Sequence, residues 1–198
     1  MRSVAVFCGS SPGFSDDYTK AVVGLATEIA RRELLAVYGG ASVGAMDTLA
    51  NTVLSCGGRI TGVLPKQLFE KEIAHKSLTD LHVVGSMHER KALIAELSDG
   101  FVALPGGFGT LDELAEILTW AQLGIHTKPV AVLNTLGYFD SLIAFMNHAV
   151  AEGFLREENR SALIVESDPV ALLDAMDAYT PITVSKWMNQ AGEELPLP

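Results

Sequence analysis

The residues best suited to chemistry follow a short apolar segment in the middle of the chain. Residues 101–104 read Phe-Val-Ala-Leu, and Pro105 ends this run because proline cannot donate to a central β-ladder. Gly106, Gly107 and Gly109 then fall within four positions. Glycine has no Cβ, so such a loop lets a ligand approach the backbone closely. The free N–H groups at the start of a following helix hold phosphate well, and this stretch therefore predicts a phosphate site.

Glu113 admits two interpretations from its position in the sequence. Thr110-Leu-Asp-Glu113 fits a capping box, in which the threonine caps the first helical turn and the glutamate reaches back to it. A capping box needs no preceding glycines, whereas close approach of a ligand does, so the glycines favour a functional role. Position 112 is Asp where the dinucleotide fingerprint needs glycine, and no G-x-x-x-x-G-K-[ST] loop occurs. The loop therefore suits the phosphate of a mononucleotide.

Arg90 lies on the apolar face of a second expected helix. It shares this face with Leu93, Ile94 and Leu97, at helical spacings of three, four and seven. A buried guanidinium needs an anionic partner, which is either a ligand or a carboxylate of the fold, unless its long stem carries it to solvent. We therefore take Arg90 as a candidate for the site. The pattern alone predicts that Lys91, about 100° around the helix, is a solvated surface lysine.

Seven short apolar segments alternate with helical patterns along the chain. The expected strands cover residues 4–8, 34–38, 60–64, 81–84, 101–104, 130–133 and 162–165. The first expected helix begins after Ser15, and the others cover residues 43–54, 87–97, 111–123, 138–151 and 169–178. Residues 66–80 read as irregular. This alternation predicts an α/β fold, a Rossmann-like doubly wound sheet of about seven mainly parallel strands with helices on both faces. Ligands bind such sheets beyond the carboxyl ends of the strands, where Gly9, Gly39, Ser86 and Gly106 would meet.

Length and composition favour one nucleotide-binding domain, residues 1–180, with a tail of residues 181–198. Hydrophobic residues make up 48% of the 198 residues, and no apolar run approaches the ~20 that span a bilayer. We therefore expect a cytoplasmic protein that does not bind membranes. A net charge of −10 argues against nucleic acid as a partner. The five histidines show no ligand spacing, so no metal site is expected, and Cys8 and Cys56 are expected to be reduced, buried thiols.

The helix after the glycine loop is apolar on more than one face. Leu111, Leu114 and Leu118 form one stripe, which Ile117 and Trp120 extend. So widely apolar a helix is either buried within its own chain or in contact with another subunit. We expect a homodimer or higher homo-oligomer that uses this helix, with burial within one chain as the alternative.

Two of these motifs resemble those of a known family. Residues 105–113, Pro-Gly-Gly-Phe-Gly-Thr-Leu-Asp-Glu, resemble the P-G-G-x-G-T-x-x-E motif of the LOG (Lonely Guy) family, the cytokinin riboside 5′-monophosphate phosphoribohydrolases. Residues 87–91, Met-His-Glu-Arg-Lys, resemble its M-x-x-R-K segment, and the similarity extends over nearly the whole chain to about residue 178. The sequence departs from the family at Ala41 and Asp47, where glycine is commoner.

The resemblance implies an enzyme that hydrolyses the N-glycosidic bond of a purine nucleoside 5′-monophosphate, of the cytokinin type or AMP, without a cofactor. It implies that Arg90 and Glu113 are catalytic. The substrate-binding residues that it implies are Gly9, Ser10, Glu72, Met87, Lys91, Gly106, Gly107, Phe108, Gly109, Thr110 and Thr119. Part of the wider superfamily is labelled lysine decarboxylase, but nothing in the sequence marks a Schiff-base lysine with a pyridoxal-phosphate pocket.

The alternative function is a carrier or sensor that binds a nucleotide or cofactor on the same scaffold without catalysis. Such a protein needs a phosphate cradle but no pair like Arg90 and Glu113. Hydrolysis of an N-glycosidic bond, in contrast, passes through an oxocarbenium-like transition state that a carboxylate stabilises. An ionised Glu113 near the anomeric carbon meets this need, with phosphate on the glycine loop and Arg90 paired to Glu113 or to a ligand oxygen.

Overall fold

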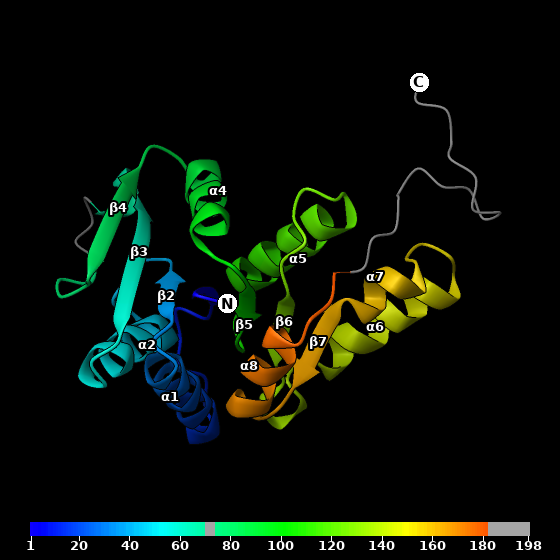
Figure 1. Ribbon diagram of the computed structural model, residues 1–198, viewed down its shortest axis with the longest axis horizontal. Helices are drawn as coiled ribbons and strands as arrows, with labels where there is room; N and C mark the ends of the chain where they lie inside the picture. The colour runs from blue at the N-terminus through cyan, green and yellow to red at the C-terminus, as the bar shows by residue number, and fades with distance from the viewer. Residues whose placement is uncertain (70–73, 182–198) are drawn as a thin grey trace.

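A computed structural model describes residues 1–69 and 74–181 and contains one seven-stranded sheet (Figure 1). The strands are β1 (Ser3–Phe7), β2 (Leu35–Tyr38), β3 (Arg59–Pro65), β4 (Asp80–Val84), β5 (Phe101–Ala103), β6 (Val130–Leu133) and β7 (Leu163–Glu166). Their order across the sheet is β4-β3-β2-β1-β5-β6-β7, and every neighbouring pair is parallel. The predicted doubly wound α/β fold is confirmed, and the sheet is wholly parallel.

The helices divide between the two faces of the sheet (Figure 1). They are α1 (Asp16–Arg31), α2 (Gly44–Ser55), α3 (Lys66–Phe69), α4 (Met87–Leu97), α5 (Phe108–Gln122), α6 (Asp140–Ala151), α7 (Glu157–Ser161) and α8 (Pro169–Asp177), with a 3-10 turn, η1 (Thr135–Gly137). Apolar residues of α1, α2 and α8 pack on one face of the sheet, and those of α4, α5 and α6 pack on the other. Burial on both faces explains why the strands read as continuous apolar runs.

The order of the strands reverses between β1 and β5, which lie side by side in the sheet. Phe7 pairs with Ala103, and the Leu104 N–H donates to the Phe7 carbonyl at 2.8 Å. From β1 the chain winds outward to β4, then returns through α4 to β5 and continues to β7. The chain therefore continues toward opposite edges of the sheet after β1 and after β5. This makes the gap between the loops that follow them a topological switch point, which is where ligands bind in open parallel sheets.

The expected elements match the observed ones closely, with differences at three places. The helix expected from residue 111 begins at Phe108. The sequence did not show this start because the first turn has no helical spacing of apolar residues. The short helices α3, η1 and α7 were not expected, since three to five residues are too few to show helical spacing. Cys8 is buried as expected, but Cys56 is exposed next to the end of α2, so the expectation of two buried thiols is wrong for Cys56.

Ser86 caps α4. Its hydroxyl accepts the Glu89 N–H at 3.1 Å, and the Glu89 carboxylate accepts the Gly85 N–H at 2.8 Å. Glu89 therefore reaches back to the residue before the cap rather than to the cap itself, and it serves the start of this helix. In the part of the chain that the structure describes, no helix is long and apolar enough to cross a membrane.

Candidate active site

The glycine loop leads directly into α5, whose first turn carries no side-chain cap. Gly107 is the N-cap residue, and nothing in its side chain can accept the first N–H groups of the helix. Thr110 lies inside the first turn and is buried, so it is not a cap, and the capping-box interpretation of Thr110 and Glu113 is wrong. The physical reason is that glycine tolerates the N-cap position, which lets the helix begin at Phe108, two residues before the threonine.

The three glycines of the loop meet different surroundings. A Cβ on Gly106 would collide with the Thr110 side chain and lie 3.0 Å from the Gly9 nitrogen, so the packing of the loop requires glycine there. A Cβ on Gly107 or Gly109 would meet no atom within 4 Å, and neither residue has a positive φ. The fold therefore has no need of glycine at positions 107 and 109, and the open space above them is available to a ligand.

Arg90 and Glu113 form an ion pair between α4 and α5. Arg90 Nη2 lies 3.0 Å from Glu113 Oε1, and the two side chains are 15% and 10% exposed. The guanidinium is also fixed by a bond from Nε to the Val63 carbonyl at 3.2 Å and by a contact of Nη1 with the Met87 sulfur at 3.2 Å. The anionic partner that the sequence required of Arg90 is thus Glu113, and the predicted pairing of the two residues is confirmed.

Gly39 makes room for the guanidinium at the end of β2. A Cβ at this position would overlap Arg90 Nη2, and any side chain larger than hydrogen would push the arginine away from Glu113. Sequence reasoning placed Gly39 at the ligand edge of the sheet without giving it a partner. Its role depends on the position of α4 over β2 and β3, which the sequence does not reveal.

Burial governs the protonation of the two acidic groups in the site. It raises the pKa of Glu113 above the ordinary 4.5, with Arg90 opposing the shift and Asp112 adding to it. The pKa of the Cys8 thiol is raised to about 12, mainly by burial and to a smaller extent by the nearby Glu113 charge. Cys8 therefore remains protonated at neutral pH and is a poor nucleophile. Glu113, in contrast, is a carboxyl group whose pKa lies above its ordinary range because it is buried.

A cavity of about 260 Å³ opens at the switch point next to this pair. Its polar lining includes Ser10, Arg90, Thr110 and Glu113, and its glycines are Gly9, Gly39, Gly107 and Gly109. Two further hollows, of about 270 and 390 Å³, adjoin it at the glycine loop, since Gly107 lines all three. Together they offer a nucleotide-sized space beyond the carboxyl ends of β1 and β5.

The cavity has an apolar wall that the sequence analysis did not foresee. It is formed by Ala41, Met46, Leu64 and Leu68. Three of these residues lie beyond the ends of strands or in α2, and only the folded sheet brings them together. Ala41 therefore turns its methyl group toward the cavity, in place of the glycine that is commoner in the family.

Asp47, the second departure from the family pattern, is not among the residues that line this cavity. Its carboxylate accepts a hydrogen bond from Asn51 Nδ2 at 2.9 Å and lies 3.9 Å from Nε2 of the buried His75. The backbone N–H of His75 donates to the Gly40 carbonyl at 3.0 Å. Asp47 thus belongs to a polar cluster that fixes the chain after residue 74 against α2.

The predicted substrate-binding residues fall into three groups. Gly9, Ser10, Gly107, Phe108, Gly109 and Thr110 line the main cavity, and Gly106 lines the two adjoining hollows. Met87 contacts Arg90, while Lys91 and Thr119 are not among the residues that line the main cavity. Glu72 lies outside the described residues.

Lys91 is not the solvated surface lysine that the helical pattern predicts. Its Nζ lies 3.3 Å from Asp112 Oδ2 and 3.1 Å from Glu116 Oε1, and its side chain is 12% exposed. Burial disfavours the charge of Lys91, but hydrogen bonds to Glu116 and Asp112 outweigh burial and raise its pKa. Lys91 therefore joins α4 to α5 beside the Arg90–Glu113 pair.

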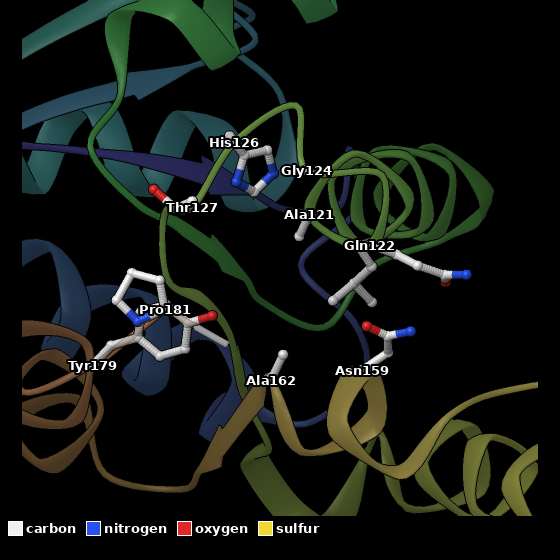
Figure 2. Close-up of a pocket in the computed structure, with 10 residues that line it drawn as sticks. Ala121, Gln122, Gly124, His126, Thr127, Asn159, Ala162, Tyr179 and Pro181 are labelled. Carbon is white, nitrogen blue, oxygen red and sulfur yellow. The ribbon is translucent and has the colours of Figure 1, made fainter. Parts of the chain in front are cut away.

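A separate cavity of about 70 Å³ lies between the end of α5, α7 and residues 179–181 (Figure 2). Both nitrogens of its His126 are engaged, Nε2 with the Ile117 carbonyl at 2.9 Å and Nδ1 with the Lys128 N–H at 3.2 Å. The cavity is too small for a nucleotide and its histidine is not available for chemistry. Residues 1–69 and 74–181 also contain no group of His, Cys, Asp or Glu that could hold a metal ion.

Known proteins resemble this chain in both sequence and fold. A family model described as "Possible lysine decarboxylase" matches residues 46–176. A cytokinin riboside 5′-monophosphate phosphoribohydrolase of Rhodococcoides fascians is 49% identical over 168 residues, which cover 84% of this chain and 85% of that protein. A probable enzyme of the same name from Oryza sativa subsp. japonica is 46% identical over 182 residues, covering 92% of this chain and 80% of the relative.

Solved structures of lower identity share the fold. The molybdenum cofactor binding protein of Rippkaea orientalis superposes with a TM-score of 0.67 at 19% identity, over 90% of this chain and 97% of that one. The molybdenum cofactor carrier protein of Chlamydomonas reinhardtii gives 0.66 at 22% identity, over 88% and 95%. At these identities the likeness concerns the fold alone.

The description of the family model does not fit the cavity. Among the described residues that line it, none is a lysine that could form a Schiff base. The sequence identity of 46–49% extends over most of the chain and of its relatives. The chain therefore belongs to the LOG (Lonely Guy) family.

Proposed function

We propose that the protein hydrolyses a cytokinin riboside 5′-monophosphate to the free base and ribose 5-phosphate. The observation that carries this proposal is the buried Arg90–Glu113 pair, which lies beside an uncapped helix start in one cavity. The names of the relatives from Rhodococcoides fascians and Oryza sativa support it. The pair supplies a charge for the reaction, and the helix start supplies a place for the phosphate.

The phosphate of the substrate lies on the first turn of α5. The N–H groups there have no side-chain cap, and the positive end of the helix dipole favours an anion. The space above Gly107 and Gly109 is open, so phosphate oxygens reach the backbone without a clash. The buried hydroxyl of Thr110 lies on the same turn and adds a donor.

Glu113 lies one helical turn beyond the phosphate-binding residues, where a negative charge does not repel the phosphate directly. An ionised carboxylate at this place stabilises the positive charge that develops on the ribose as the N-glycosidic bond breaks. The same carboxylate orients or activates the attacking water. Because the Glu113 side chain is largely buried, this electrostatic interaction is stronger than in water.

Arg90 has two tasks in this mechanism. Its charge opposes the effect of burial on Glu113, so that a larger fraction of the carboxylate is ionised near neutral pH. Its planar guanidinium, fixed by Glu113, Val63 and Met87, holds the carboxylate in one orientation. Lysine has neither the planar shape nor the number of donors for both tasks.

The base lies against the apolar wall of Ala41, Met46, Leu64 and Leu68. A purine with an apolar N6 substituent buries more surface there than adenine does, at about 0.8 kcal/mol for each buried CH₂ group. The wall therefore supports a cytokinin monophosphate over AMP as the substrate. The carrier or sensor alternative explains the phosphate cradle, but it gives no role to a buried carboxylate with a raised pKa.

We also propose that the protein is a homodimer or larger homo-oligomer. The helix α5 contributes less than its sequence suggested, because Leu114 and Ile117 are buried in the core of the same chain. The helix α6 has no buried residue, and its Phe145 side chain is 66% exposed. Exposed apolar residues also remain on α5 and just beyond it, at Leu111 and Ile125. Together these surfaces suit contact with a second copy.

Light scattering tests the assembly. We expect a mass of at least twice the 21.1 kDa of one chain at micromolar concentration, and a lower mass for Phe145→Glu because the charge opposes burial in an interface. Phe14→Glu is the matched control, since Phe14 is also an exposed phenylalanine but lies before α1. A monomeric wild-type protein would contradict the proposal.

Chromatographic assay of base release tests the substrate. We expect hydrolysis of isopentenyladenosine 5′-monophosphate without added metal, at a kcat/KM at least tenfold above that for AMP because of the apolar wall. The corresponding nucleoside is the control for the phosphate cradle, and it should react far more slowly. Equal rates for nucleoside and monophosphate would refute the cradle, and no base release from any monophosphate would refute the enzyme.

Gly109→Ala separates the needs of the ligand from those of the fold. Alanine favours a helix by about 1 kcal/mol over glycine, and its Cβ meets no atom within 4 Å, so the melting temperature should be unchanged or higher. The methyl group fills the space above the cradle, so KM should rise by about tenfold or more. Gly57→Ala is the control for KM at an unrelated glycine with open space around it; because Gly57 has a φ of +75°, this substitution should lower the melting temperature while KM stays at the wild-type value. Wild-type KM in Gly109→Ala would place the phosphate elsewhere.

A further inference from the structure

The hydroxyl of Tyr138 is bound to the backbone of the glycine loop. It donates to the Gly106 carbonyl at 2.5 Å. Tyr138 lines the two adjoining hollows together with Gly106 and Gly107, but it is not among the residues that line the main cavity. The mechanism above gives this contact no role, although it joins a residue that follows β6 to the loop that precedes α5.

A strained turn presents Tyr138 to the loop. Leu136 has a φ of +53°, a left-handed conformation that is unfavourable for any residue with a branched side chain. The Asn134 side chain closes the turn, since its Oδ1 accepts the Phe139 N–H at 2.7 Å and its Nδ2 donates to Asp140 Oδ1 at 2.7 Å. Strain that is held in place by such bonds points to a function for the side chain that the turn presents.

The peptide between Gly106 and Gly107 meets little steric resistance to a flip. A flip changes ψ of the first residue and φ of the second, and neither glycine has a Cβ to oppose it. The peptide is trans, so its N–H points away from its C=O. A hydroxyl that holds the Gly106 carbonyl therefore also fixes the direction of the Gly107 N–H. In the described part of the chain, no group accepts a hydrogen bond from this N–H.

We propose that Tyr138 is a positioning residue that locks this peptide, so that the Gly107 N–H faces the phosphate of the substrate. The inference rests on the proposed function, in which the phosphate lies at the start of α5. Gly107 lines the main cavity and Tyr138 does not, so an N–H that is turned away from Tyr138 is available to a phosphate in that cavity. An N–H held in place before the ligand arrives adds affinity, because less order is lost on binding.

Tyr138→Phe removes the hydroxyl and keeps the ring, which Tyr18 and Phe139 contact edge-on at 5.8 and 5.2 Å between centroids. The KM for isopentenyladenosine 5′-monophosphate should rise by about three- to tenfold, the range of one hydrogen bond, with kcat changed by less than about twofold. Hydrolysis of the corresponding nucleoside should keep its slow rate, because it has no phosphate. Tyr179→Phe is the matched control, since it removes a phenol hydroxyl beside the small separate cavity, and it should leave both reactions unchanged.

Ribose 5-phosphate measures the cradle without catalysis. Calorimetry should give a dissociation constant about three- to tenfold higher for Tyr138→Phe than for the wild type. NMR relaxation dispersion of the Gly107 amide, recorded without ligand, should be flat in the wild type. It should show exchange in Tyr138→Phe, because the peptide then samples both orientations on the microsecond to millisecond timescale.

An unchanged affinity of Tyr138→Phe for ribose 5-phosphate would overturn the proposal, as would equal losses of kcat/KM for the nucleoside and the monophosphate. If wild-type protein releases no base, the proposed function fails, and the binding of ribose 5-phosphate still decides the role of Tyr138. If the wild type does not bind ribose 5-phosphate either, a flat dispersion profile in Tyr138→Phe would reject the lock on the peptide.

Discussion

The site depends on one constraint, that a carboxylate placed inside a protein must have a cation within reach. Glu113 is 10% exposed, and Arg90 lies 3.0 Å from it. Much of the surrounding sequence serves this contact. Gly39 leaves room for the guanidinium, and the Val63 carbonyl holds its Nε. Removing one member of such a buried pair costs about 3–5 kcal/mol, because the other charge remains without a partner. The relative position of α4 and α5 is therefore fixed by electrostatics as well as by packing.

The parallel sheet places this pair where a ligand can meet it. The order of the strands reverses between β1 and β5, so the loops after these strands open a space at the carboxyl edge. The helix that follows β5 begins at that edge without a side-chain cap, and its N–H groups are turned toward the space. One turn later the same helix carries Glu113. In the proposed function, a single helix thus presents its start to the phosphate and a carboxylate to the ribose of a nucleoside monophosphate.

The sequence predicts the fold well because seven apolar strands alternating with helices allow few other arrangements. It also predicts that Arg90 needs an anion, since the residue falls on a buried helical stripe. It does not decide the role of Glu113, because the capping-box pattern is present and only the start of α5 at Phe108 excludes it. The wall of Met46 and Leu68, and the partners of Lys91, come from separate elements and have no signal in any one segment of sequence. Contacts of this kind appear only when the elements are packed.

The most direct measurement of the central claim is turnover and melting temperature on one preparation of Glu113→Gln. Glutamine keeps the shape of the side chain but removes its charge. Burial raises the pKa of Glu113, so the carboxylate adds stability only at low pH and its ionised form costs stability at neutral pH. Arg90 loses its ionised partner but can still donate to the amide oxygen of glutamine, so it is not left without a partner. We therefore expect a melting temperature close to that of the wild type, with base release reduced by about 10²-fold or more. Near-normal turnover with a lowered melting temperature would show that Glu113 serves the fold and would contradict the account.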